Sequence, residues 1–238
     1  MADLRTDGFT ILRGAFSLPE VSALIAGWES ACRESSDTIL RAGETPYGAR
    51  HVLDVWPGAA DAAKAAPLRE AVCDVLGKGA GLVRVLFFDK PPGNSWALPW
   101  HKDLTIAVRE HVGGEVFAKP TVKAGVPHVE ASLEFLQRML TARVHLDDAD
   151  AENGALRVLV GSHHTGKALK HEGLAEELIE VSAGDVLLMQ PLLAHASSNS
   201  REGTERHRRV LHLEFAADAE LLGGYEWHTF RALNEPGS

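Results

Sequence analysis

Short apolar runs separated by glycine, proline and aspartate fill most of the chain after residue 80. Runs rich in leucine, valine and phenylalanine begin at Leu82, Thr141, Leu156, Asp185 and Arg208. Each run has the length of an ordinary strand, and the turn-forming residues between them are typical of antiparallel β structure. This pattern predicts a mainly β fold, which we interpret as a jelly-roll barrel over about residues 81–216.

The preceding part of the chain, about residues 1–80, has a helical pattern with little strand. Ser17 and Glu20 form a capping-box pattern, and the apolar residues after them fall on one helical face. A second helix is expected at residues 67–76, where Gly77 would end it. We therefore expect N-terminal helices packed on the barrel, and one domain covering the whole chain.

Composition narrows the class of partner and the compartment. The net charge of -9 argues against binding to a nucleic-acid backbone. No apolar run approaches the roughly 20 residues that span a bilayer, and the start of the sequence lacks an apolar signal region. Cys32 and Cys73 are the only cysteines, so no disulfide framework is expected. These features predict a cytoplasmic protein, monomeric or a small homo-oligomer, that does not bind membranes.

A His-x-Asp step at residues 98–106 is the first candidate site. We interpret this stretch as one strand, so His101 and Asp103 should project to one face and Lys102 to the other. The two side chains would offer an imidazole and a carboxylate to a single ion. His195, which follows a later strand, is the candidate third ligand. Two histidines and one carboxylate are the ligand set of non-haem Fe(II) oxygenases.

A pair of arginines suggests what else binds there. Three protein ligands leave room on an octahedral metal for O2 and a chelating 2-oxo acid, whose far carboxylate needs a partner. Arginine suits that carboxylate because its planar fork donates two charge-assisted hydrogen bonds. Arg208 and Arg209 open the strand after His195 and point to opposite faces. One should reach inward and the other should be solvated, and alternation alone leaves open which.

Because of these motifs, the chain resembles the phytanoyl-CoA dioxygenase family of Fe(II)/2-oxoglutarate oxygenases. The resemblance covers nearly the whole chain and implies the double-stranded β-helix, a cupin-like jelly roll. Its motifs are WHKDL at 100–104, VHLDD at 144–148, NGALRVL at 153–159, GSH at 161–163, GDV at 184–186 leading to His195-Ala-Ser197, and RRVLHL at 208–213.

The resemblance implies Fe(II) and 2-oxoglutarate as cofactors, O2 as co-reactant and a small molecule as substrate. By it, His101, Asp103 and His195 match the iron ligands, Arg208 with Ser197 matches the group that binds the distal carboxylate of 2-oxoglutarate, and Arg143, Leu86 and Arg50 match further positions around the cosubstrate. Lys102 departs from the usual glutamine, and Val160 stands where proline is frequent. Related halogenases have a small residue where this chain has Asp103, so the resemblance favours hydroxylation.

Two other functions fit the same residues. One is a catalytically silent jelly-roll module that binds a metal or acts as a sensor. The other is a zinc-type hydrolase on the same barrel, which would have no use for Arg208. Dependence on 2-oxoglutarate and release of succinate would separate both from an oxygenase.

Residues 109–135 form a long connection with scattered glycine and proline. We expect an irregular lid over the metal that carries the substrate contacts, since long loops within a compact domain are usually functional. Arg109, Lys119, Lys123 and His128 are its candidate polar anchors.

The remaining histidines have ordinary structural interpretations. His145, His163 and His212 stand in strand or turn contexts, and we expect them to be held by hydrogen bonds rather than to bind metal. Asn153-Gly154 is expected to make a tight turn that needs a positive φ.

Overall fold

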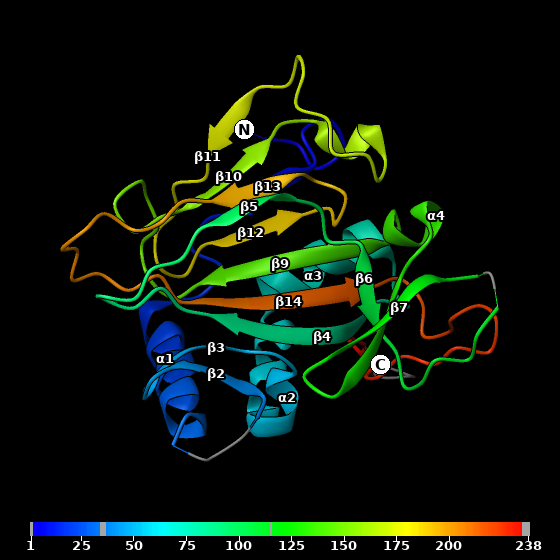
Figure 1. Ribbon diagram of the computed structural model, residues 1–238, viewed down its shortest axis with the longest axis horizontal. Helices are drawn as coiled ribbons and strands as arrows, with labels where there is room; N and C mark the ends of the chain where they lie inside the picture. The colour runs from blue at the N-terminus through cyan, green and yellow to red at the C-terminus, as the bar shows by residue number, and fades with distance from the viewer. Residues whose placement is uncertain (1, 34–36, 115, 235–238) are drawn as a thin grey trace.

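The computed structural model describes residues 2–33, 37–114 and 116–234. It confirms the mainly β, jelly-roll fold, with antiparallel sheets and few helices (Figure 1). The strands are β1 (Phe9–Leu12), β2 (Ile39–Ala42), β3 (Thr45–Ala49), β4 (Gly81–Phe88), β5 (Leu98–His101), β6 (Thr105–Ala107), β7 (Ala118–Lys123), β8 (Val126–Glu130), β9 (Met139–His145), β10 (Leu156–Leu159), β11 (Glu176–Leu178), β12 (Val186–Met189), β13 (His195–Ser197), β14 (Val210–Ala216) and β15 (Arg231–Ala232). The helices are α1 (Leu18–Ala31), α2 (Val52–Val55), α3 (Ala66–Leu76) and α4 (Leu133–Leu136), with 3-10 turns η1 (Pro57–Lys64) and η2 (Ser162–Thr165).

The major sheet has the strand order β1-β12-β9-β14-β4-β3-β2, and β15 pairs with β4 beside it. Helices α1 and α3 lie on one of its faces (Figure 1). Alternate residues of β9 and β14, such as Val144 and Leu213, are buried toward these helices. The ring of Trp28 on α1 stacks on Phe87 of β4, with centroids 3.9 Å apart. The intervening side chains of the same strands therefore face the other way, into the barrel.

The minor sheet, in the order β11-β10-β13-β5, closes the barrel over that inner face (Figure 1). Phe9 and Leu187 of the major sheet pack with Leu156, Val158 and Ile179 in one apolar cluster between the layers. This cluster fills part of the interior and leaves the rest to the polar side chains described below. Among the described residues, no helix has the length and apolar character needed to cross a bilayer.

The long connection after the His-x-Asp motif is more regular than its composition predicts. Strands β7 and β8 form a hairpin and pair with β6 in a third sheet. Ala124 (φ 48°) and Gly125 (φ 81°) make its two-residue turn, the conformation that joins twisted antiparallel strands best. The expectation of an irregular segment was therefore wrong, because Gly125 makes a hairpin turn rather than interrupting a strand.

The His-x-Asp motif does not lie on one strand. Strand β5 ends at His101, and β6 begins at Thr105 in a different sheet, so Asp103 lies in the turn between them. The backbone N–H of Asp103 donates to the carbonyl of Pro191 at 2.9 Å. This hydrogen bond lies outside the pairing of β5 with β13, so the strand ends before Asp103. The prediction of a single strand is wrong, although the side chains of His101 and Asp103 still come together.

Candidate active site

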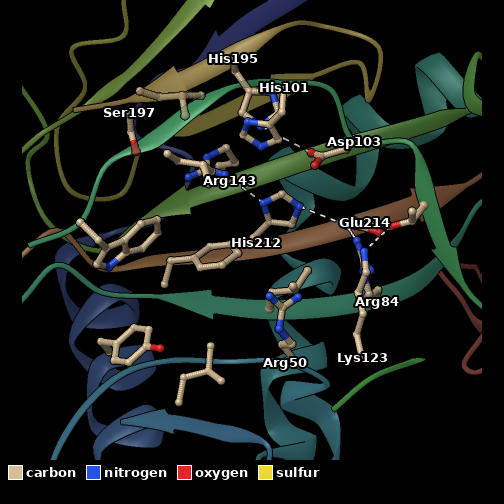
Figure 2. Close-up of a pocket in the computed structure, with 18 of the residues that line it drawn as sticks. Arg50, Arg84, His101, Asp103, Lys123, Arg143, His195, Ser197, His212 and Glu214 are labelled. Carbon is tan, nitrogen blue, oxygen red and sulfur yellow. Dashed lines mark hydrogen bonds and ion pairs between the residues drawn. The ribbon is translucent and has the colours of Figure 1, made fainter. Parts of the chain in front are cut away.

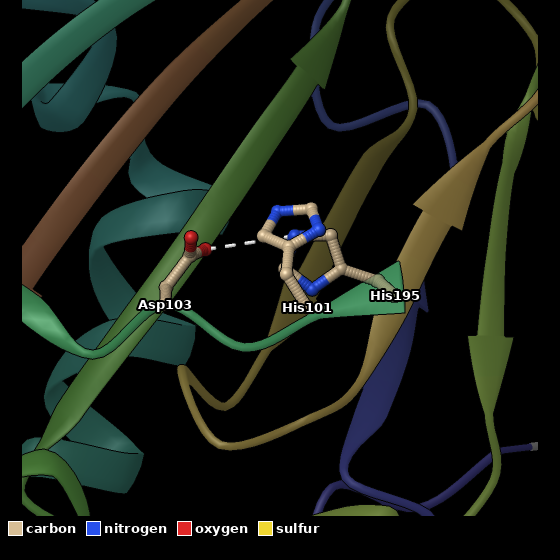
Figure 3. Close-up of side chains that lie close together, drawn as sticks. All are labelled: His101, Asp103 and His195. Carbon is tan, nitrogen blue, oxygen red and sulfur yellow. Dashed lines mark ion pairs between the residues drawn. The ribbon is translucent and has the colours of Figure 1, made fainter. Parts of the chain in front are cut away.

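His101, Asp103 and His195 come together at the junction of β5 and β13. The two histidines face each other in the register of these antiparallel strands, with ring centroids 4.1 Å apart. Asp103 reaches the same point from the turn after β5, and its Oδ2 lies 3.7 Å from His195 Nε2. One ligand atom from each residue lies within 4.8 Å of the other two (Figure 3). The three predicted ligands thus form one cluster that can surround a single ion.

The donor atoms of this cluster suit a divalent metal. His101 Nδ1 lies 2.8 Å from the Pro99 carbonyl, and His195 Nδ1 lies 2.9 Å from that of Leu193. Each Nδ1–H can donate there, which leaves Nε2 unprotonated and free to bind a metal. Asp103 Oδ2 is buried and has no hydrogen-bond partner in the described part of the chain. An unpartnered carboxylate oxygen beside two imidazoles fits the ligand set for Fe(II).

The protonation states also favour metal binding. Burial lowers the pKa of His195 to about 4, although Asp103 opposes that shift. For Asp103, burial raises the pKa, but the nearby His195, His212 and His101 outweigh it and bring the value to about 2. Near neutral pH the imidazole of His195 is therefore neutral and the carboxylate of Asp103 is charged, as ligands must be.

Ser162 braces the segments that carry the cluster. The side chain of Lys102, which stands between His101 and Asp103 in the sequence, points away from both as predicted. Its Nζ donates to the Ser162 carbonyl at 2.8 Å and to the Gly166 carbonyl at 2.6 Å. The N–H of Ala194, next to His195, donates to Ser162 Oγ at 2.8 Å. One buried serine therefore contacts both ligand-bearing segments.

A cavity of about 370 Å³ opens beside the cluster and runs between the two sheets (Figure 2). All the residues predicted to bind the metal or the cosubstrate line it, namely Arg50, Leu86, His101, Asp103, Arg143, His195, Ser197 and Arg208. The volume is in the usual range for small-molecule sites. The structure therefore brings the predicted metal-binding and cosubstrate-binding residues around one cavity.

Arg208 is the inward arginine of the pair. It is 1% exposed, and its Nε and Nη1 have no hydrogen-bond partner among the described residues. Lys90, which the sequence analysis overlooked, is fully buried nearby and donates to Ser197 Oγ at 3.2 Å and to the Ser198 carbonyl at 2.5 Å. A buried guanidinium with unpartnered nitrogens needs an anion, and a carboxylate of 2-oxoglutarate fits it.

Arg209 points outward but is not solvated, contrary to the sequence expectation. Its Nε and Nη2 lie 2.9 and 2.6 Å from the two carboxylate oxygens of Asp147, and the side chain is 17% exposed. This two-pronged ion pair holds the start of β14 against the turn after β9.

The family model of phytanoyl-CoA dioxygenase (PhyH) matches residues 4–209. The chain belongs to this family. The protein is therefore an Fe(II)/2-oxoglutarate-dependent oxygenase, with Fe(II) and 2-oxoglutarate as its cofactors. A search of curated proteins finds no match.

Several solved structures share this fold. AviO1 from Streptomyces viridochromogenes Tue57 is 21% identical, with a TM-score of 0.62 over 90% of this chain and 91% of that one. EctD from S. alaskensis, solved with 2-oxoglutarate and 5-hydroxyectoine, is 19% identical, with a TM-score of 0.66 over 90% and 73%. HygX from Streptomyces hygroscopicus, with nickel and 2-oxoglutarate bound, is 20% identical, with a TM-score of 0.60 over 90% and 84%.

In this PhyH-family chain a row of polar side chains crosses the inner face of the major sheet. Arg84 on β4 pairs with Glu214 on β14, and His212 Nε2 lies 3.3 Å from Glu214 Oε1. Arg143 on β9 donates from Nη1 to His212 Nδ1 at 3.1 Å, so His212 carries its proton on Nε2 (Figure 2). Arg84 and Glu214 were not among the residues predicted from the sequence. Glu214 is two residues from His212, and Arg84 is two from Leu86, so strand alternation could have found both.

Replacing Arg84 with alanine is expected to lower the free energy of unfolding by about 3–5 kcal/mol, because it strands the buried carboxylate of Glu214. The side chains of this pair are 10% and 6% exposed. Urea unfolding followed by circular dichroism measures the effect. Lys64→Ala is the control, since the side chains of Lys64 and Asp61 are each 71% exposed and such a pair contributes at most about 1 kcal/mol. Equal losses in both variants would contradict a structural role for the Arg84–Glu214 pair.

His145 departs from its expected structural role, whereas His163 and His212 do form hydrogen bonds. Both ring nitrogens of His145 are buried with no hydrogen-bond partner in the part of the chain that is described. Burial, helped by Arg143 and Arg208, holds the pKa of His145 well below its usual value. The ring is therefore neutral, which avoids the larger cost of burying a third positive charge near those of Arg143 and Arg208.

Proposed function

We propose that this oxygenase hydroxylates a small organic molecule, converting 2-oxoglutarate and O2 to succinate and CO2. The main support for this proposal is that the His101-Asp103-His195 cluster faces a cavity that is also lined by the unpartnered guanidinium of Arg208. A metal-binding module without turnover would have no need of that buried cation. Asp103, a carboxylate rather than a small residue, supports hydroxylation over halogenation.

In this proposal each part of the cavity has one task. His101, Asp103 and His195 hold the metal, and Arg208 with Ser197 binds the distal carboxylate of 2-oxoglutarate. Arg143 and Leu86 line the path between these two points. When bound, Fe(II) and 2-oxoglutarate would supply the electrons that activate O2, which is the oxidant. The protein orients both reactants, keeps bulk water out and places one C–H bond near the metal.

The hairpin within residues 109–135 supplies one wall of the site in this proposal. Lys123, at the end of β7, lines the cavity. The other predicted anchors do not: Arg109 and Lys119 are exposed and pair with Glu226 and Glu130, and His128 is buried behind Arg84, 3.0 Å from its Nη1. The substrate-contacting role of the segment therefore rests on Lys123.

Succinate formation tests the proposal directly. The purified protein should convert 2-oxoglutarate to succinate when Fe(II) and O2 are present, and faster with a substrate that gains one oxygen atom. Zinc should not replace iron. Absence of any 2-oxoglutarate conversion in protein that binds Fe(II) would indicate the silent module, and hydrolysis supported by zinc would indicate the hydrolase.

A further inference from the structure

Three cationic side chains meet on the wall of the cavity away from Ser197. Arg50 follows β3, Arg84 lies on β4 and Lys123 ends β7, so three separate segments contribute (Figure 2). We call these three residues the basic wall. All of them line the cavity that contains the metal cluster.

The charges of the basic wall are only partly neutralised. Arg84 pairs with Glu214. Lys123 Nζ donates to Thr105 Oγ1 at 2.9 Å, a neutral hydroxyl. Within the described residues, neither Lys123 nor Arg50 forms an ion pair with a carboxylate. Burial, then the charges of Arg84 and Arg50, lower the pKa of Lys123 below its usual value, and the carboxylates of Glu214 and Asp103 oppose this shift without reversing it. Like charges are therefore held together beside a cavity, which is unfavourable unless an anion joins them.

The cosubstrate does not supply that anion. 2-Oxoglutarate has two carboxylates, and the proposed function assigns one to the metal and the other to Arg208. Arg50 matched a position around the cosubstrate in sequence, but it lies beside Lys123 at the far side of the cavity from Ser197 (Figure 2). A second anion is needed to balance Arg50 and Lys123.

We propose that the substrate is a small organic acid whose carboxylate or phosphate group is bound by Arg50 and Lys123. This inference rests on the proposed function, since it names the substrate class of the same site. The apolar cavity residues Leu40, Tyr47 and Phe88 would cover the carbon skeleton. The anionic group would then anchor one end of the molecule and direct the other end toward the metal cluster.

Sulfate is the first probe, used on protein loaded with Ni(II) and excess 2-oxoglutarate so that Arg208 is already occupied. Sulfate should raise the melting temperature of the wild type. In Arg50→Gln/Lys123→Gln its affinity should fall at least about ten-fold, because hydrogen bonds to charged groups are lost. The charge-keeping variant Arg50→Lys/Lys123→Arg should retain most of the response.

The matched control is Arg41→Gln/Lys119→Gln, which removes the same charge from exposed positions on β2 and β7. It should respond to sulfate like the wild type, which separates specific binding from a general salt effect. Equal sulfate responses in the wild type and in Arg50→Gln/Lys123→Gln would overturn the proposal.

The second arm uses the Fe(II) enzyme and pairs of small molecules that differ in one group. Carboxylic acids are compared with their primary amides, and phosphate monoesters with the parent alcohols, by stimulated succinate formation. Stimulation by the acids or the phosphates, and not by their neutral partners, is expected and identifies the anionic group. Equal stimulation by neutral partners would refute the anionic class. If no succinate forms under any condition, the proposed function fails, while the sulfate measurement still decides the anion site.

Discussion

Replacing any one of His101, Asp103 and His195 with alanine should abolish Fe(II)-dependent turnover while leaving the protein folded. The three donor atoms lie within 4.8 Å of one another, so each residue supplies one of the three protein ligands to the ion. Loss of an outer partner of a metal ligand typically costs roughly 10- to 100-fold in metal affinity, and loss of a ligand itself should cost more. Titration with Fe(II) under anaerobic conditions measures this directly.

The fold is expected to survive each of these substitutions. Asp103 Oδ2 has no hydrogen-bond partner to lose among the described residues, and His101 is only half buried. Circular dichroism checks this for each variant. His164→Ala is the matched control, because His164 is exposed and away from the cluster. A variant that kept normal metal affinity and full turnover would remove its residue from the ligand set.

Replacing Arg208 with alanine should weaken 2-oxoglutarate binding while the metal still binds. Removal of one partner from a buried charge pair costs roughly 2–5 kcal/mol, which corresponds to about 30-fold to several thousand-fold in affinity. The substitution should weaken 2-oxoglutarate binding without destabilising the fold, because Nε and Nη1 of Arg208 have no hydrogen-bond partners in the described structure that would be left unsatisfied. Calorimetric titration of 2-oxoglutarate into Ni(II)-loaded protein gives the dissociation constant.

The neighbouring Arg209→Ala variant is the informative comparison. Since Arg209 is held by both oxygens of Asp147, its replacement should lower the melting temperature and leave the 2-oxoglutarate affinity close to that of the wild type. A larger loss of 2-oxoglutarate affinity in Arg209→Ala than in Arg208→Ala would show that the wrong arginine has been assigned to the cosubstrate.

Strand periodicity predicts most of the barrel but not where its strands end. Leu211, Leu213 and Phe215 alternate with polar residues, as in a strand, and the structure places them toward the helices. The end of β5 at His101 was not predictable in this way, because it depends on the Pro191 carbonyl, far away in sequence, which takes the N–H of Asp103. The β7–β8 hairpin was missed because Gly125 was interpreted as irregular structure.

The candidate site was predictable where one residue type has one strong chemical use. Histidine and aspartate indicated the metal ligands, and the paired arginines at 208 and 209 indicated a carboxylate partner. The family resemblance selected Arg208 and added Ser197, Arg143, Leu86 and Arg50. The burial of Lys90 in the site was not predictable, because a lysine in a proline-rich turn is expected to be exposed. It is buried because acceptors from distant segments, the carbonyls of Gly154 and Ser198 and the hydroxyl of Ser197, surround its Nζ.

The contacts of Ser162 bear on the thermodynamics of metal capture. Its carbonyl accepts from Lys102 and its hydroxyl from the N–H of Ala194, so the two chain segments bearing His101 and His195 are tied to one buried point. The spacing of the imidazoles therefore does not depend on an ion to draw them together. Metal uptake then requires little loss of chain entropy, so more of the free energy of ligand binding should appear as metal affinity.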